Sequence, residues 1–361
     1  MQESDFNGSN PILTWLSEAV SRGASDLHLT ACCAPHLRIE GELVALQGES
    51  VSDENLSTWI QAVLPEDAWQ QFGTQKNVDR SIELPLTHGT HRFRVNGFLG
   101  DRGVGACFRL IPTEIPDLDW AGFPMHVADQ LANFRDGLVL VSGVTGSGKS
   151  TTLAMILDRM HNAGGKRILT LEEPIEYRFG PNPHSLVTQR EVGRDVDSFA
   201  DGLKYGLRQD PDVILVGEIR GQDTARWAIT AAETGHLVFS TLHTRDAKGA
   251  ISRIADIFPK QLQEAVLSQL ALSLRAVVSQ QLIPSADPTS KRELALEILY
   301  NTSPVASAMR QGRVESIDNA IVTGRHDGMI TMDESLRRLV DSGRIQRDVA
   351  RRFANDPTNF S

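Results

Sequence analysis

The 361-residue sequence has few cysteines, few aromatic residues and no long apolar run. Its three cysteines, Cys32, Cys33 and Cys107, are too few for a disulfide framework and lack the C-x-x-C spacing of a four-thiolate zinc site. No stretch reaches 18 consecutive apolar residues, which excludes an ordinary membrane-spanning helix. The first residues are acidic and polar, unlike a signal peptide. These absences predict a cytoplasmic protein.

Basic residues are outnumbered, with 36 Lys and Arg against 46 Asp and Glu, so the net charge is −10. Such a balance argues against a protein that coats nucleic acid or is held on lipid by its overall charge. We therefore expect no nucleic-acid partner. Apolar residues make up 40% of the chain, and the length is enough for two domains.

The first part of the chain mixes helical and strand patterns. A helix is predicted after Asn10 and Pro11, and residues 52–72 are also helical in pattern. Strands are predicted at 24–29, 91–96 and 105–111, with a hairpin at 38–44. Residues 1–111 are thus predicted to form an α+β domain. Three prolines, Pro112, Pro116 and Pro124, then predict a linker at 112–124.

The second part, residues 125–361, is predicted to be an α/β domain. Continuous apolar strands at 138–142, 168–171, 213–216 and 237–241 alternate with helical stretches. This alternation indicates a mainly parallel sheet covered on both faces. From about Lys260 the pattern is helical, and Thr331–Glu334 forms a capping box, so the C-terminal part is expected to be helical.

Residues 143–150 fit the phosphate-loop pattern G-x-x-x-x-G-K-[ST] in full, between an apolar strand and a helical run. Glycines allow backbone N–H groups to surround phosphates, and the helix start adds partial positive charge. Lys149 is predicted to reach the β- and γ-phosphates of ATP, and Ser150 to ligate Mg²⁺. The predicted nucleotide-binding residues in this segment are Gly143, Val144, Thr145, Gly146, Ser147, Gly148, Lys149, Ser150 and Thr151.

Hydrolysis also needs carboxylates near the metal and the attacking water. Glu218 follows the strand at 213–216 and is predicted to act at the metal. Glu172, Glu173 and Glu176 follow the strand at 168–171, and three acids this close repel one another unless a cation is near. Glu172 and Glu173 are therefore also predicted to ligate the metal. Because the carboxyl ends of parallel strands meet at one edge, these groups are expected to share one crevice.

Two histidines flank the fourth strand. His243 follows it and is expected at the same edge as Lys149, facing the phosphates. His236 lies just before the strand, and the residues alone leave its role open between structural and nucleotide-binding.

Several segments together resemble a known family. The phosphate loop, 170–176, 209–220 and 234–244 are similar to the secretion ATPases of type II secretion and type IV pili. The segments 23–29, 92–96, 189–195 and 328–333 resemble the retraction ATPases that drive twitching motility. The resemblance extends from about residue 12 to about residue 348.

The resemblance implies a PAS-like N-terminal domain, a RecA-like ATPase domain and a homohexameric ring that hydrolyses ATP. It implies a location at the inner membrane beneath the pilus, against a platform protein of the pilus machinery. Of the residues, Glu176 corresponds to the catalytic glutamate, Glu218 to the Walker B glutamate, and His236 and His243 to the His box. Arg94 and Arg109 correspond to arginines that reach a neighbour's nucleotide.

The sequence departs from this family in two places. Glu173 stands where the family usually has aspartate, and residues 302–310 match the Ala-Ile-Arg motif of retraction ATPases poorly. A pilus-assembly or secretion ATPase of the same superfamily is therefore an alternative, although those commonly carry paired C-x-x-C motifs and this sequence has none. A DNA-translocating RecA-like motor and a nucleotide-gated adaptor that hydrolyses ATP poorly are two further alternatives.

Overall fold

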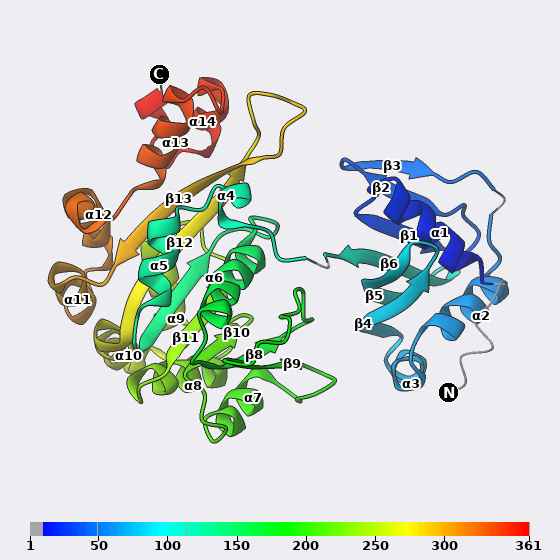
Figure 1. Cartoon of the computed structure of the whole chain (residues 1–361), viewed down its shortest axis with the longest axis horizontal. Coiled ribbons are helices and arrows are strands. Elements are labelled where there is room, and N and C mark those ends of the chain that lie inside the picture. Colours follow the sequence, from blue (N-terminus) through cyan, green and yellow to red (C-terminus); the bar gives the residue numbers. More distant parts are fainter. Residues whose placement is uncertain (1–9, 49, 113, 361) are drawn as a thin grey trace. The chain divides into compact units, whose positions relative to one another are not determined.

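The computed structural model describes residues 10–48, 50–112 and 114–360. The chain divides into two compact units, residues 1–114 and 115–361, each with its own core (Figure 1). The division falls inside the predicted linker, and later linker residues belong to the second unit. There α4 (Leu118–Ala121) forms one helical turn, and Leu118 and Phe123 are buried in the core. Within the described residues, no helix combines the length and apolarity that a bilayer crossing requires.

The first unit is a six-stranded antiparallel sheet in the order β3-β2-β1-β6-β5-β4. Its strands are β1 (Asp26–Thr30), β2 (His36–Ile39), β3 (Glu42–Ala45), β4 (Asn77–Leu86), β5 (Gly89–Gly100) and β6 (Gly103–Ile111). Its helices are α1 (Pro11–Ser21), α2 (Asp53–Val63) and α3 (Glu66–Gln75). The predicted α+β character is confirmed, and the structure shows that the sheet is antiparallel. The pattern did not predict β4, which contains Pro85 and forms the edge of the sheet, where proline is tolerated.

The second unit is built on a seven-stranded, mostly parallel sheet in the order β13-β12-β7-β11-β10-β8-β9. The strands are β7 (Gly137–Ser142), β8 (Arg167–Glu172), β9 (Leu186–Glu191), β10 (Val213–Val216), β11 (Leu237–Leu242), β12 (Leu274–Ile283) and β13 (Glu293–Tyr300). β12 and β13 pair antiparallel, and the other neighbours are parallel. All six residues of β7 and of β11 are buried, as expected for strands covered on both faces.

Helices connect and cover these strands. They are α5 (Met125–Ala132), α6 (Lys149–Ala163), α7 (Phe199–Gly206), α8 (Gln222–Glu233), α9 (Ala247–Asp256), α10 (Lys260–Ser273), α11 (Ser303–Arg310), α12 (Ile317–Thr323), α13 (Met332–Asp341) and α14 (Arg347–Phe353). α5 packs against α6, whereas α8 packs against α7 and α10. The side chain of Thr331 accepts from the N–H of Glu334, so the predicted cap of α13 is confirmed.

The expectation of continuous helix after Lys260 is wrong between residues 274 and 300. α10 ends at Ser273, and the chain then forms β12 and β13, which complete one side of the sheet. Both strands are almost entirely buried. A buried apolar run has neither the period of a half-exposed strand nor that of an amphipathic helix, which explains the error.

A buried carboxylate ties the C-terminal helices to this sheet. Glu297 of β13 accepts from the N–H of Ala247 at 2.8 Å and of Met332 at 3.4 Å. These are the first residues of α9 and α13, so one side chain serves two helix N-termini. Burial raises the pKa of Glu297 to about 7, although both N–H groups lower it.

Candidate functional site

The phosphate-loop motif links the carboxyl end of β7 to the first turn of α6. Gly143, Gly146 and Gly148 have φ values of 148°, 76° and 87°, which side chains rarely adopt. A Cβ at Gly143 would also lie 2.4 Å from the carbonyl oxygen of Gln280. The glycines of the motif are therefore required by the backbone path.

Lys149 is buried within this loop. Its ammonium donates to the carbonyls of Gly143 at 2.8 Å and Val144 at 3.0 Å. Burial lowers the pKa of Lys149, while Glu218 and then Glu176 raise it. Both predicted catalytic carboxylates therefore lie near enough to Lys149 to affect its pKa.

Two residues that sequence reasoning missed support the loop from β12. The amide nitrogen of Gln280 donates to the carbonyl of Ser147 at 2.6 Å, and both side chains are buried. The hydroxyls of Ser279 and Ser142 lie 2.7 Å apart, joining β12 to the end of β7. The polar residues 279–281 within an apolar run are the sequence feature that could indicate this role, but the sequence pattern predicts a helix there.

Glu218 follows β10 by two residues and lies at the same edge of the sheet. Its Oε1 pairs with Arg220 at 2.5 Å. Its Oε2 is buried, lacks a hydrogen-bond partner among the described residues, and lies 3.4 Å from Nε2 of His243. Thr241 donates to the carbonyl of Gly217 at 2.6 Å, which ties the ends of β10 and β11 together. The structure therefore brings Glu218 and His243 together as predicted.

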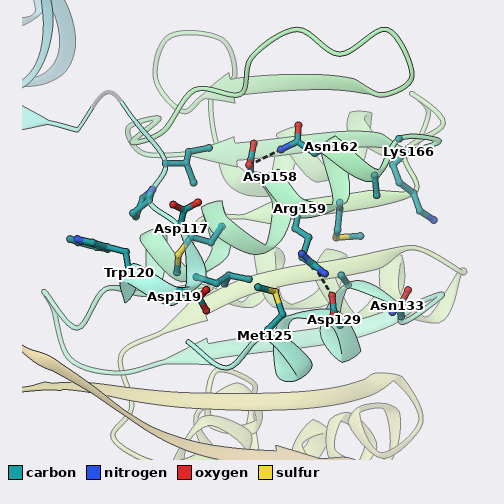
Figure 2. A pocket seen from close by; sticks show the side chains of 18 residues that line it. Asp117, Asp119, Trp120, Met125, Asp129, Asn133, Asp158, Arg159, Asn162 and Lys166 are labelled. Carbon is teal, nitrogen blue, oxygen red and sulfur yellow. Dashed lines mark hydrogen bonds and ion pairs between the residues drawn. The ribbon is translucent and has the colours of Figure 1, made fainter. Parts of the chain in front are cut away.

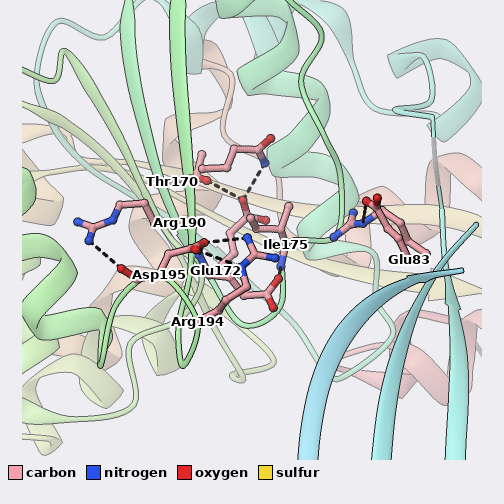
Figure 3. Close-up of polar contacts among 10 residues, drawn as sticks. Glu83, Thr170, Glu172, Ile175, Arg190, Arg194 and Asp195 are labelled. Carbon is pink, nitrogen blue, oxygen red and sulfur yellow. Dashed lines mark hydrogen bonds and ion pairs between the residues drawn. The ribbon is translucent and has the colours of Figure 1, made fainter. Parts of the chain in front are cut away.

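The acidic segment, residues 172–176, begins at the last residue of β8, and its carboxylates contact other protein groups. Oε1 of Glu172 accepts from Thr170 at 2.7 Å and from Gln189 at 3.1 Å (Figure 3). Burial raises the pKa of Glu172 to about 7, and these hydrogen bonds lower it. Oε2 of Glu173 lies 3.7 Å from Nη1 of Arg220. Metal ligation by Glu172 and Glu173 stays a prediction, and in this chain both carboxylates already have protein partners.

The structure does not bring His236 to this crevice. His236 precedes β11 and lies beside the start of β7, where its carbonyl accepts from the N–H of Gly137. The phosphate loop follows the other end of β7. His236 Nδ1 lies 3.0 Å from the carbonyl of Ala231. Within one chain, His236 and His243 thus lie at opposite ends of β11.

Arg94 and Arg109 lie in the first unit and are direct cross-strand partners on β5 and β6. They therefore share one face of the sheet, as expected for hairpin neighbours. Arg94 pairs with Asp79 at 2.6 Å, and Arg109 pairs with Asp26 at 2.8 Å. The Arg109 side chain is 63% exposed, so much of it is open to solvent.

The residues present fit a nucleoside triphosphate with a divalent cation. The loop offers backbone N–H groups, an ammonium, and the buried hydroxyl of Ser147, which has no hydrogen-bond partner among the described residues. Ser150 is exposed at the helix start, and Oε2 of Glu218 accepts no hydrogen bond from the described part of the chain. In the described ranges, no group of three or more His, Cys, Asp or Glu could hold a metal by itself. Mg²⁺ is usually held by one or two protein groups together with phosphates, and Ser150 and Glu218 would be those groups here.

The hydroxyl of Thr151 lies 3.0 Å from the hydroxyl of Tyr177. This contact joins α6 to the chain just after the acidic segment.

A separate cavity of about 740 Å³ lies beside α4, α5 and the second half of α6 (Figure 2). It is bordered by Trp120, Met125 and several aspartates, and Asp129 pairs with Arg159 across part of it at 2.5 Å. The phosphate loop meets the other end of α6, and no predicted site residue lines this cavity. It is therefore distinct from the candidate site.

The fold and the loop together define a class, the P-loop α/β proteins, in which a phosphate loop joins a central strand to a helix and acidic residues follow the neighbouring strands. Residues 7–356 match the family described as type II/IV secretion system protein. The chain belongs to this family.

Within this family, the chain is similar to proteins of type IV pili. The chain is 41% identical to the type IV pilus retraction ATPase PilT of Pseudomonas aeruginosa over 96% of this chain and 98% of that protein. It is 40% identical to a twitching motility protein of Neisseria gonorrhoeae, over 92% and 87% of the two chains. A crystal structure of the pilus retraction motor PilT with bound ADP matches with a TM-score of 0.86 at 38% identity, covering 96% and 98%.

Proposed function

We propose that this chain is an ATP-hydrolysing motor that powers retraction of type IV pili, and hence twitching motility. The observation that carries the proposal is the complete phosphate loop around the buried Lys149, with Glu218 and Glu176 near enough to raise the pKa of Lys149, in a fold similar to that of PilT. Similarity to PilT along nearly the whole chain supports retraction over the assembly and secretion alternatives.

Each side chain has a defined task in this proposal. The loop N–H groups and Lys149 bind the phosphates, while Ser150 and Glu218 hold Mg²⁺. Glu176 accepts a proton from the attacking water, and His243 contacts the buried oxygen of Glu218. Bound Mg²⁺–ATP supplies the phosphoanhydride bond whose hydrolysis releases free energy. A positioned general base typically contributes about 10²–10⁴-fold to the rate.

The finer architecture follows from the same proposal. The first unit corresponds to a PAS-like domain, residues 1–111, and the second to a RecA-like ATPase domain, residues 125–361, with the linker at 112–124. Six copies form a ring at the cytoplasmic side of the inner membrane, against a platform protein of the pilus machinery. Nucleotide-dependent closure between the two domains is the power stroke.

Arg94 and Arg109 are proposed to act on a neighbour's nucleotide. They lie side by side on one sheet face, and the exposed Arg109 is accessible to another copy of the chain. An arginine supplied across a subunit boundary makes hydrolysis depend on ring geometry, and such residues contribute about 10³–10⁵-fold in other systems.

The first test is ATP turnover by the purified chain. Lys149→Ala should abolish hydrolysis and weaken nucleotide binding, because the buried cation of the loop is lost. Lys260→Ala removes the same charge from an exposed helix start and should leave turnover unchanged. Normal hydrolysis by Lys149→Ala would exclude this site as the ATPase centre.

The second test separates retraction from its alternatives. Deletion of the gene should leave cells with excess surface pili and no twitching, because extension continues without retraction. Cells without pili would indicate an assembly ATPase. Strong stimulation of turnover by DNA would instead indicate a nucleic-acid motor.

A further inference from the structure

β9 is the edge strand beside β8, and its last residues begin the segment 189–195, to which the proposed function assigns no role. Side chains two apart on a strand share a face, so Gln189 and Glu191 point to one side and Thr188 and Arg190 to the other. The face with Gln189 and Glu191 contacts the acidic segment that contains Glu176.

Gln189 makes three hydrogen bonds to this segment. Its amide nitrogen donates to Oε1 of Glu172 at 3.1 Å and to the carbonyl of Tyr177 at 2.8 Å. Its amide oxygen accepts from the N–H of Phe179 at 3.2 Å. One side chain therefore grips the segment on both sides of Glu176, at positions 172 and 177–179.

Glu191 adds a fourth contact within the segment. Its Oε2 accepts from the N–H of Ile175, the residue before Glu176, at 3.1 Å. Glu191 is buried, and its own N–H donates to Oδ2 of Asp195 at 2.9 Å. The turn that follows is fixed to β8, since the N–H of Val192 donates to the carbonyl of Glu172 at 2.8 Å.

The N–H of Glu176 completes the set, because it faces the carboxylate of Glu172 that Gln189 already holds. Residues 172–179 are thus bound to β9 before and after the position of Glu176. A carboxylate on a flexible loop would sample many positions, whereas catalysis requires the base to stay within hydrogen-bond reach of water.

We propose that Gln189 and Glu191 are positioning residues for hydrolysis, which hold residues 172–179 so that the Glu176 carboxylate keeps a fixed place opposite Lys149. They act through Glu176 and do not touch the nucleotide themselves. This inference rests on the proposed function, in which Glu176 is the general base.

The test is Gln189→Leu, which keeps the approximate size and removes all three hydrogen bonds. A displacement of about 1 Å in a catalytic group can cost about 10²-fold, so kcat should fall roughly 10- to 100-fold. Affinity for a fluorescent ATP analogue should stay within about twofold, because the phosphate loop is untouched. Thr188→Val is the matched control: it removes a hydrogen bond with Arg167 on the opposite face of β9 and should leave kcat unchanged.

A double-variant comparison separates positioning from general damage. Single-turnover rates are measured for Gln189→Leu alone, Glu176→Gln alone and the two combined. If Gln189 acts through Glu176, it costs nothing further once the base is gone. An equal fold-loss in both backgrounds would overturn the proposal, as would an unchanged kcat in Gln189→Leu.

Gln189→Glu covers the case in which the leucine variant fails to fold. It keeps the acceptor for Phe179 but places a carboxylate against Glu172 and the carbonyl of Tyr177. It should therefore also lose kcat without losing nucleotide affinity, and full activity would refute the inference. The proposed function fails separately, if the wild-type chain hydrolyses no ATP or if Glu176→Gln is fully active.

Discussion

The contact between Gln280 and the phosphate loop leads to a quantitative prediction. In Gln280→Leu, the carbonyl of Ser147 loses the donor that lies 2.6 Å away in a buried environment. Leaving a buried acceptor unsatisfied costs about 1–3 kcal/mol, equivalent to about 5- to 150-fold in a binding constant. The amide oxygen of Gln280 is itself buried without a hydrogen-bond partner among the described residues, and leucine removes that group too. We therefore expect the lower part of this range, about tenfold.

The assay is a titration with a fluorescent ATP analogue, together with chemical denaturation of the same preparations. The loss should appear as weaker nucleotide binding, because the loop must recover its path to surround the phosphates, with a smaller loss of unfolding free energy. Gln281→Leu is the control: the neighbouring side chain points to the other face of β12 and is only partly buried. If binding and stability of Gln280→Leu both match those of Gln281→Leu, the support assigned to Gln280 is refuted.

Three further predictions concern catalysis, assembly and stability. Glu176→Gln should keep ATP binding and lose about 10²–10⁴-fold in turnover, since an amide cannot accept the proton; a wild-type rate would mean that the base is another residue. Mixing Lys149→Ala with Arg94→Ala/Arg109→Ala should restore ATPase activity if the arginines act across subunits, whereas mixed hexamers seen by native mass spectrometry without activity would contradict it. Because burial raises the pKa of Glu297 from 4.5 to about 7, its stabilising contribution is full below pH 4.5 and is lost as the pH rises through 7. Denaturation across this range should show wild type losing up to about 3 kcal/mol relative to Glu297→Gln; parallel curves would contradict this assignment.

The parts of the site that could be predicted from sequence are those encoded locally. The phosphate loop needs glycines at set positions between a strand and a helix, so Gly143–Ser150 is recognisable without a structure. Glu218 and His243 follow apolar strands, and parallel strands deliver their last residues to one edge. The same rule could have placed His236 at the opposite edge, because it precedes its strand.

The parts that could not be predicted depend on contacts between distant segments. Gln280 supports a loop more than 130 residues earlier, and nothing in its own segment indicates which strand lies beside it. Metal ligation by Glu172 stays a prediction, but its protein partners Thr170 and Gln189 are evident only from the structure, which pairs β8 with β9. The partners of Gln280 and of Glu172 both depend on the order of the strands in the sheet, which the local sequence does not show.

The position of β9 has a consequence for local opening of the site. β7, which carries the phosphate loop, is flanked by β12 and β11, whereas the loop with Glu176 is fastened to an edge strand. Strands inside a sheet exchange their amide hydrogens through rare, large openings, and edge strands through frequent, small ones. The two segments therefore differ in kinetic lability: the segment with Glu176, the proposed base, opens and re-forms more often than the phosphate loop does.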